Sequence, residues 1–198
     1  MNSLQRVISI ERLDALTLRL SVIAALTVVL VLDAVVDRNW PLPVLGLFDE
    51  IGHLATAWVL LVALLPDRYQ SLVPWALLGA VLIDVDHIPL YAWGVGTAPD
   101  GQGRPVTHSL AVVLVLVALS RLAGRLRTPL SGLALGVALH LVRDVVTGPG
   151  ASLFWPIAEA SVLVPYSLYA GLLCLAAARA LFRPGRRPPP AARPQPLA

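Results

Sequence analysis

The sequence predicts an all-α protein, a polytopic transmembrane bundle of about six helices with both termini in the cytoplasm. Three observations predict this fold class. Hydrophobic residues make up 57% of the 198 residues and charged residues only 14%, whereas ordinary soluble domains are about 45–50% apolar. The apolar residues form long continuous runs, which favours helices over the alternating strands of a membrane barrel. The arginines gather in alternate connecting segments, which sets an orientation.

Six apolar runs predict the six helices. A helix rising 1.5 Å per residue needs about 20 residues to cross a hydrocarbon core of about 30 Å. The fourth and fifth runs are shorter, as expected of helices whose ends line a polar cavity. The first run is too long for the apolar part of a signal peptide, so we expect it to be retained. The predicted helices are Leu16–Val36, Leu45–Leu65, Leu72–Trp93, Thr107–Leu122, Leu130–Val146 and Ala160–Leu181.

The basic residues, all of them arginine, predict the orientation. With the N-terminus inside, the cytoplasmic segments hold most of them, which the positive-inside rule favours: Arg6, Arg12, Arg68, Arg121, Arg125, Arg127, Arg183, Arg186, Arg187 and Arg193. This distribution explains the basic pI by topology and gives no indication of direct nucleic-acid contact. The predicted organisation is a cytoplasmic segment over 1–15, a membrane domain over 16–182 and a disordered cytoplasmic tail, rich in proline and arginine, over 183–198.

All four histidines lie beside acidic or hydroxyl residues, at or near the ends of apolar runs. Ionisable groups in membrane segments are costly, so each cluster is a candidate functional site. In the predicted topology all four clusters fall in the outer half of the membrane, and we expect one shared polar site. The clusters are Asp49-Glu50-Ile51-Gly52-His53, Asp84-Val85-Asp86-His87, Arg104-Pro105-Val106-Thr107-His108-Ser109 and His140-Leu141-Val142-Arg143-Asp144.

The spacing within these clusters suits a divalent metal ion, zinc or manganese. Imidazole and carboxylate groups are its usual ligands, and water in an open coordination position becomes a nucleophile. Asp86 is expected to point away from its neighbours. Three pairs are three or four residues apart and so share a helix face: Asp49 and His53, Asp84 and His87, and His140 and Asp144. The single cysteine, Cys174, excludes an intramolecular disulfide and a cysteine-rich zinc site.

Three of the four clusters also have a purely structural explanation. Asp49 and Glu50 could be acidic residues favoured by the dipole near a helix N-terminus. Thr107 could cap the fourth helix. Arg143 could form an ion pair with Asp144, which would leave no metal site.

These motifs resemble the bacterial membrane-bound metal-dependent hydrolases, the YdjM-like group of LexA-binding, inner-membrane-associated hydrolases. The resemblance runs from about Phe48 to Pro156. Asp84-Val85-Asp86-His87 and Thr107-His108-Ser109 are its most specific parts, and His140-x-x-x-Asp144 is moderately specific. The family usually has His-Arg-Gly before Thr-His-Ser, whereas this chain has Gly103-Arg104-Pro105-Val106 and so lacks one histidine. The resemblance implies metal-assisted hydrolysis at the inner membrane of a bacterium and supplies no substrate.

Together these observations predict a multi-pass membrane hydrolase with a metal site at the outer face. Asp86 would support the ligands or act as general base. Arg104 would clamp a phosphate or carboxylate. A site at headgroup level suggests a membrane lipid or other amphiphile as substrate, such as a lipid or isoprenoid phosphoester. The predicted ligand pool is His53, Asp84, His87, His108, His140 and Asp144.

Two other classes of function fit parts of the sequence. A transporter or metal-handling protein could use the same histidine and aspartate cluster, since such groups also form ion paths. Its path should then place polar groups at several depths, whereas the inner halves of the second to fifth helices carry almost no charge. The basic, proline-rich tail would suit a regulatory partner of cytoplasmic proteins.

Overall fold

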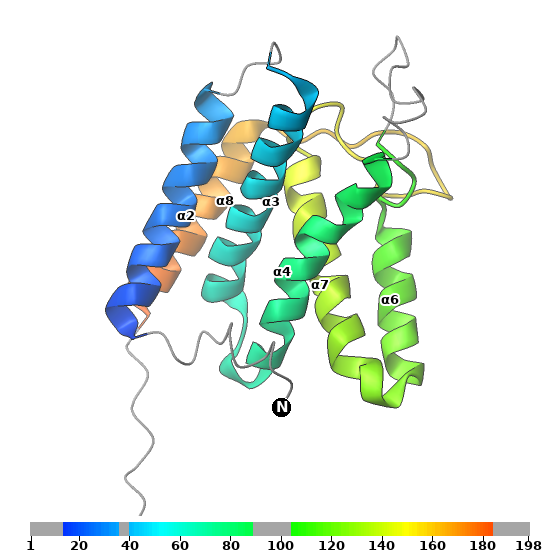
Figure 1. The fold of residues 1–198 in the computed structure, drawn as a ribbon, viewed down its shortest axis with the longest axis horizontal. Coiled ribbons are helices and arrows are strands. Elements are labelled where there is room, and N and C mark those ends of the chain that lie inside the picture. Colours follow the sequence, from blue (N-terminus) through cyan, green and yellow to red (C-terminus); the bar gives the residue numbers. More distant parts are fainter. Residues whose placement is uncertain (1–13, 36–39, 89–103, 184–198) are drawn as a thin grey trace, which may run out of the picture.

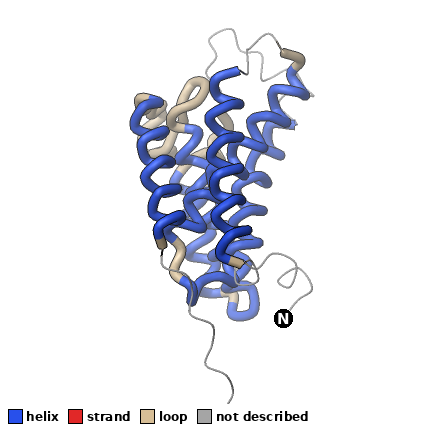
Figure 2. The backbone as a smooth tube through the Cα atoms, turned by 90° about the vertical axis from the view of Figure 1, so that its left-hand side faces the viewer, coloured by secondary structure: helices blue, strands red, loops and turns tan. Residues whose placement is uncertain are grey.

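The computed structural model of the chain describes residues 14–35, 40–88 and 104–183. Within these residues it has six α-helices and no strand (Figures 1 and 2), so the all-α prediction is confirmed. Each predicted helical segment overlaps one of these helices. They are α2 (Ala15–Val35), α3 (Leu42–Leu64), α4 (Val73–Leu82), α6 (Leu110–Leu122), α7 (Arg127–Asp144) and α8 (Tyr166–Phe182), with 3₁₀ turns η2 (Asp67–Leu72), η3 (Ile83–Asp86) and η5 (Gly124–Leu126).

The helices form two groups of three (Figure 1). In one group α2, α3 and α8 contact one another, and in the other α7 lies against both α4 and α6. Helix α3 joins the groups, because it also contacts α4 and α7. The core of the first group consists of small and branched aliphatic side chains that pack densely, among them Val22, Val29, Val59, Leu173 and Ala177.

Helices α4 and α7 approach each other closely because glycines face the contact. A Cβ atom on Gly136 would lie only 2.1 Å from the carbonyl oxygen of Ala76. Gly132 lies one turn earlier on the same face, in the small-xxx-small pattern that lets helix backbones meet. The same four-residue spacing continues along α7 to His140 and then Asp144. The stripe that packs α7 against α4 therefore ends in two candidate metal ligands.

Two helices begin or end differently from the sequence prediction. The third helix was expected to run on from Leu82, but α4 ends there and the chain tightens into η3. Helical backbone returns at His87 and Ile88, and the predicted end of this helix at Trp93 lies outside the described residues. The last helix was expected to begin at Ala160, but α8 begins at Tyr166, directly after Pro165. A proline disfavours α-helical backbone at the residue before it, so Pro165 excludes the preceding residues from the helix.

Two of the described helices could cross a membrane by length and composition, Ala15–Val35 and Pro43–Leu64. Leu110–Leu122 and Tyr166–Phe182 are apolar but shorter. Six full spans are therefore not established by helix length. The predicted N-terminal segment and C-terminal tail lie almost entirely outside the described residues.

A candidate metal centre

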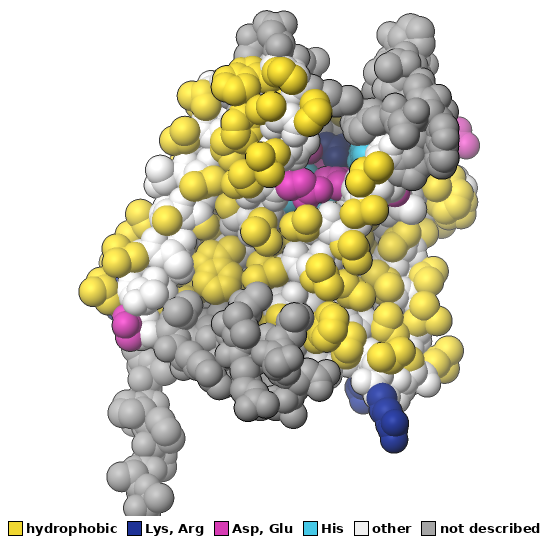
Figure 3. All heavy atoms as spheres, viewed as in Figure 1, with side chains coloured by type: hydrophobic (Ala, Val, Ile, Leu, Met, Phe, Trp, Pro, Cys, Tyr) yellow, Lys and Arg dark blue, Asp and Glu magenta, His cyan; other side chains and the backbone are white. Residues whose placement is uncertain are grey.

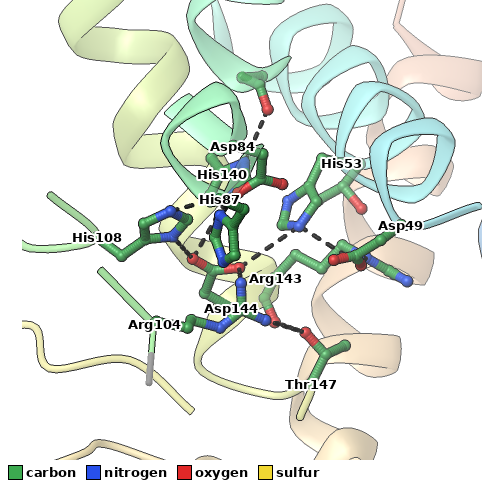
Figure 4. Close-up of polar contacts among 12 residues, drawn as sticks. Asp49, His53, Asp84, His87, Arg104, His108, His140, Arg143, Asp144 and Thr147 are labelled. Carbon is green, nitrogen blue, oxygen red and sulfur yellow. Dashed lines mark hydrogen bonds and ion pairs between the residues drawn. The ribbon is translucent and has the colours of Figure 1, made fainter. Parts of the chain in front are cut away.

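The four histidines converge on one another, although each comes from a different part of the chain (Figure 4). His53 lies in α3 and His140 in α7, and their rings stack with centroids 3.6 Å apart. His87 directly follows η3, and His108 lies two residues before α6. The predicted juxtaposition of the four clusters is therefore present in the fold.

Asp84 lies at the middle of this cluster. Its Oδ1 atom is 3.3 Å from Nε2 of His108, 3.4 Å from Nε2 of His140 and 3.4 Å from Nδ1 of His87. Ligand bonds of about 2.0–2.1 Å in a tetrahedral zinc site place neighbouring ligand atoms about 3.3–3.4 Å apart. The spacing around Asp84 is thus the spacing that ligands of one ion require.

Asp86 faces the same centre, and the expectation that it points elsewhere is wrong. Its Oδ1 atom is 2.9 Å from Nδ1 of His87 and 3.5 Å from Nε2 of His108. Its other oxygen accepts a hydrogen bond from the Thr107 hydroxyl. The prediction assumed the 3.6-residue period of an α-helix, whereas η3 is a 3₁₀ turn. Thr107 also does not cap α6, since Ser109 occupies the N-cap position.

A second group of ligand atoms lies beside the first. Asp144 Oδ1 is 3.4 Å from Nε2 of His53, and Asp144 Oδ2 is 3.2 Å from Nε2 of His140. All three residues are fully buried. The described residues hold three groups whose ligand atoms lie within 4.8 Å of one another: Asp84, Asp86, His87 and His108; His53, His140 and Asp144; and Asp49, His53 and Asp84.

Hydrogen bonds fix which nitrogen of two histidines faces the centre. Nδ1 of His140 lies 2.8 Å from the backbone carbonyl of Ala80. Because a carbonyl only accepts, Nδ1 carries a proton, and in the neutral imidazole Nε2 then keeps its lone pair. Nδ1 of His108 lies 2.7 Å from Asp144 Oδ2, which likewise leaves Nε2 of His108 as an acceptor. Such outer partners are the usual support of metal-ligating histidines.

Several of the converging atoms are buried without a hydrogen-bond partner among the described residues. An imidazole lone pair and a carboxylate oxygen both accept, so they cannot satisfy each other. Each such buried group left unsatisfied would cost about 1–3 kcal/mol. Cations bound between the members of each group would satisfy them, and the residues therefore fit divalent metal ions. The atoms are Nε2 of His53, His108 and His140 and Oδ1 of Asp84 and Asp86.

Comparison with known proteins agrees with the sequence motifs. The model of the YdjM inner membrane protein family matches residues 23–192. The chain belongs to this family. The chain matches no curated protein and no solved structure. The match covers every candidate ligand named above, so the resemblance read from the motifs is confirmed.

In this YdjM-family chain two arginines lie beside the centre. Arg104 is mostly buried, with Nη1 2.5 Å from Asp144 Oδ1 and Nη2 donating to the Thr147 hydroxyl at 3.2 Å. One structural explanation supposed an ion pair between Arg143 and its neighbour Asp144. This pair does not form among the described residues. Arg143 pairs with Asp33, with Nη2 2.6 Å from Oδ1. Asp144 is therefore shared between Arg104 and the histidines, since its Oδ1 faces both Arg104 and His53 and its Oδ2 faces His108 and His140.

The centre is reached from the side of the bundle. Figure 3 shows acidic and histidine side chains at the bottom of a hollow among hydrophobic side chains. The exposed hydrophobic residues of α3, α4 and η3 in this YdjM-family chain include Leu47, Ile51, Leu54, Leu78, Leu82 and Val85. The arrangement combines a polar centre suited to hydrolytic chemistry with an apolar surround.

Sequence reasoning left Asp33 without a role and missed the polar network around Arg143. Tyr166 donates to Asp33 at 2.9 Å, and Arg143 donates to the Tyr169 hydroxyl at 3.3 Å. The one available signal was an aspartate inside the first apolar run, because a buried carboxylate requires a partner. Nothing in the spacing of Asp33 and Arg143, which lie 110 residues apart, identifies that partner.

Proposed function

We propose that this YdjM-family protein is a multi-pass inner-membrane hydrolase. It would use one or two divalent ions, zinc or manganese, bound on the side of the inner membrane that faces away from the cytoplasm. Its substrate would be an amphiphile, a lipid or isoprenoid phosphoester. One observation carries the proposal. Buried acceptor atoms from α3, η3, α7 and the segment before α6 converge at the spacing of metal ligands, and no described donor satisfies them.

The ligand pool divides into two neighbouring groups with Asp84 between them. His87, His108 and Asp86 form one group with Asp84, and His53, His140 and Asp144 form the other. Asp84 Oδ1 contacts histidine nitrogens of both groups, so a bridging carboxylate and a two-ion centre are the arrangement we favour. Ions bound there would polarise an ester and lower the pKa of water towards about 7.

Asp86, which also belongs to the first ligand group, and Arg104 have roles that follow from their positions. Asp86 is a quarter exposed, and Thr107 holds one of its oxygens. It is the carboxylate we assign as proton acceptor, because it lies at the edge of the centre where water can reach it. Arg104 contacts Asp144 through one nitrogen and Thr147 through another. Its planar guanidinium suits two oxygens of a phosphate group.

The location of the polar groups favours a hydrolase over a transporter. His108 lies just before α6 and Asp144 ends α7, whereas His53 lies near the midpoint of α3, so no candidate ligand lies in the half of α3 that ends at Leu64. A transport path would need comparable groups at several depths. The core between α2, α3 and α8 is instead formed by aliphatic side chains over much of its length.

Elemental analysis of the detergent-purified protein tests the metal site. We expect stoichiometric zinc, manganese or another transition metal in the parent and its loss in His108→Ala and His140→Ala. Ser120→Ala is the matched control. Ser120 is buried in α6, the helix that follows His108, and its hydroxyl donates to the carbonyl of Val117 in the same helix. A parent that binds no divalent ion even after loading contradicts the hydrolase proposal.

The substrate class has a separate test. The metal-loaded parent is incubated in mixed micelles with a phospholipid or an isoprenoid phosphate, and phosphate or headgroup release is measured. Release that His140→Ala abolishes supports the phosphoester assignment. Turnover of a carboxylic ester or an amide in place of both phosphoesters would contradict that assignment and retain the hydrolase.

A further inference from the structure

A second buried polar network adjoins the candidate metal centre, with Arg143 at its middle. Arg143 precedes the ligand Asp144 in α7, and only 4% of its surface is exposed. Its guanidinium pairs in fork geometry with Asp33 of α2, Nη2 to Oδ1 at 2.6 Å and Nη1 to Oδ2 at 3.2 Å. Two parallel hydrogen bonds fix the plane of the guanidinium as well as its position.

The backbone of α3 is shaped to receive this side chain. A Cβ atom on Gly52 would lie 2.6 Å from Cζ of Arg143. A residue with a side chain at this position would therefore displace the guanidinium. Gly52 directly precedes His53 in the sequence, so the guanidinium lies against the turn of α3 that carries a candidate ligand.

The third guanidinium nitrogen faces the metal centre. Nε of Arg143 lies 3.5 Å from Oδ1 of Asp49, and the same oxygen lies 3.6 Å from Nε2 of His53 (Figure 4). Asp49 thus stands between the arginine and the ligand group that also contains Asp84. Because Asp33 takes the two strong hydrogen bonds, Asp49 keeps lone pairs for an ion.

The same network reaches the remaining helix of this group. Tyr166 and Tyr169 of α8 bond to Asp33 and to Arg143. The Tyr169 hydroxyl in turn shares a hydrogen bond with Thr56 of α3. Helices α2 and α8 contribute no residue to the three ligand groups, yet both are tied to the centre through this one arginine.

We propose that Arg143 is a positioning residue of the metal centre. Its guanidinium, oriented by Asp33, holds Asp49 beside His53 and so keeps the ligand geometry of α3 in register with α7. This inference rests on the proposed metal site. The competing explanation is that Arg143 acts only through its positive charge, which would oppose cation binding.

Metal affinity distinguishes positioning from charge. The probes are zinc, titrated against a competing chelator, and cobalt(II), whose absorption spectrum reports ligand geometry. Arg143→Lys keeps the charge and loses the fork, Asp33→Asn loses the anchor outside the centre, and Gly52→Ala displaces the guanidinium while every charge remains. Positioning predicts that all three weaken zinc binding by about 10–100-fold, as is usual for residues that hold metal ligands, and alter the cobalt spectrum.

A second buried arginine provides the control. Arg179 of α8 donates Nε to the carbonyl of Ala63 in α3 at 2.9 Å, far along the same helix pair from the centre. Arg179→Lys should lower thermal stability of the metal-free protein without changing zinc affinity or the cobalt spectrum. The contrast with Arg143→Lys separates a local effect on the centre from general loosening of α3 against its neighbours.

Each alternative result has a definite meaning. Parent-like zinc affinity in Arg143→Lys together with tighter binding in Arg143→Met would overturn positioning and establish a charge effect. Parent-like affinity in both Asp33→Asn and Gly52→Ala would overturn it even if Arg143→Lys failed to fold. A parent that binds neither zinc nor cobalt would overturn this inference together with the metal site, whereas a metal-binding parent with insensitive variants overturns the inference alone.

Discussion

Replacing Gly136 by alanine would separate α4 from α7 at the point that supports the metal centre. The new Cβ atom would lie 2.1 Å from the Ala76 carbonyl oxygen and 2.7 Å from the Ala80 nitrogen. Both are backbone atoms, so no side chain can move aside. Ordinary contact begins at 3.4 Å, so α4 must shift by about 1.3 Å, the difference between these distances.

This shift has a stability cost and a cost at the site. Overpacking lowers the unfolding free energy by about 1–3 kcal/mol, whereas replacing a glycine inside a helix by alanine raises it by about 1 kcal/mol. With a backbone clash the upper part of that range applies, which leaves a net loss of about 2 kcal/mol and lowers Tm by about 4–8 °C. The same movement stretches the 2.8 Å bond from His140 to Ala80 beyond hydrogen-bonding reach. We expect metal affinity to fall by about 10–100-fold.

Thermal unfolding of the metal-free protein in detergent and chelator competition for zinc measure the two effects. Gly171→Ala is the matched control, since no atom lies within 4 Å of a Cβ placed at Gly171 in α8. The unfolding free energy of that variant should rise by up to about 1 kcal/mol, and its zinc affinity should equal that of the parent. An unchanged Tm and an unchanged zinc affinity in Gly136→Ala would refute the predicted shift of α4 away from α7.

Two further substitutions test the centre and the segment after α7. Asp84→Asn should remove both ions, whereas Asp86→Asn should remove only the one near His87, because Asp84 Oδ1 lies 3.3 Å and 3.4 Å from the Nε2 atoms of His108 and His140, one in each group. Equal metal content in the two variants, measured by elemental analysis, would exclude the bridge. Gly150→Ala should lower the unfolding free energy by about 1–2 kcal/mol, since its φ of +79° is strained for any residue with a side chain. An unchanged melting curve for that variant would mean that this turn relaxes without cost.

Much of the fold could be predicted because apolar runs and helices coincide in this chain. The first and fifth runs, for example, correspond to α2 and α7 within a few residues. The boundaries that failed lie at Leu82 and Tyr166, where a 3₁₀ turn and a proline override the apolar pattern. Hydrophobicity alone cannot place such ends, because it is insensitive to backbone geometry.

The candidate site was predictable where both partners lie in one motif. The pair His140 and Asp144 is an example, since helical spacing alone brings the two side chains to one face. Asp86 was misplaced because the same spacing rule was applied to residues that are not α-helical. The pairing of Asp33 with Arg143 depends on the packing of α2 against α7 through α3 and α8, which no local pattern encodes.

Because α7 bears both the glycine contact with α4 and two of the candidate ligands, ion binding at the proposed centre would be thermodynamically linked to folding. A ligand that binds only the native state, at a concentration about 1,000 times its Kd, adds about 4 kcal/mol to the unfolding free energy. Marginal packing between α4 and α7 could thus be tolerated when ions are plentiful. Under metal starvation the same helix pair would be the first to open, and the supply of an ion would govern how long the protein survives in the membrane.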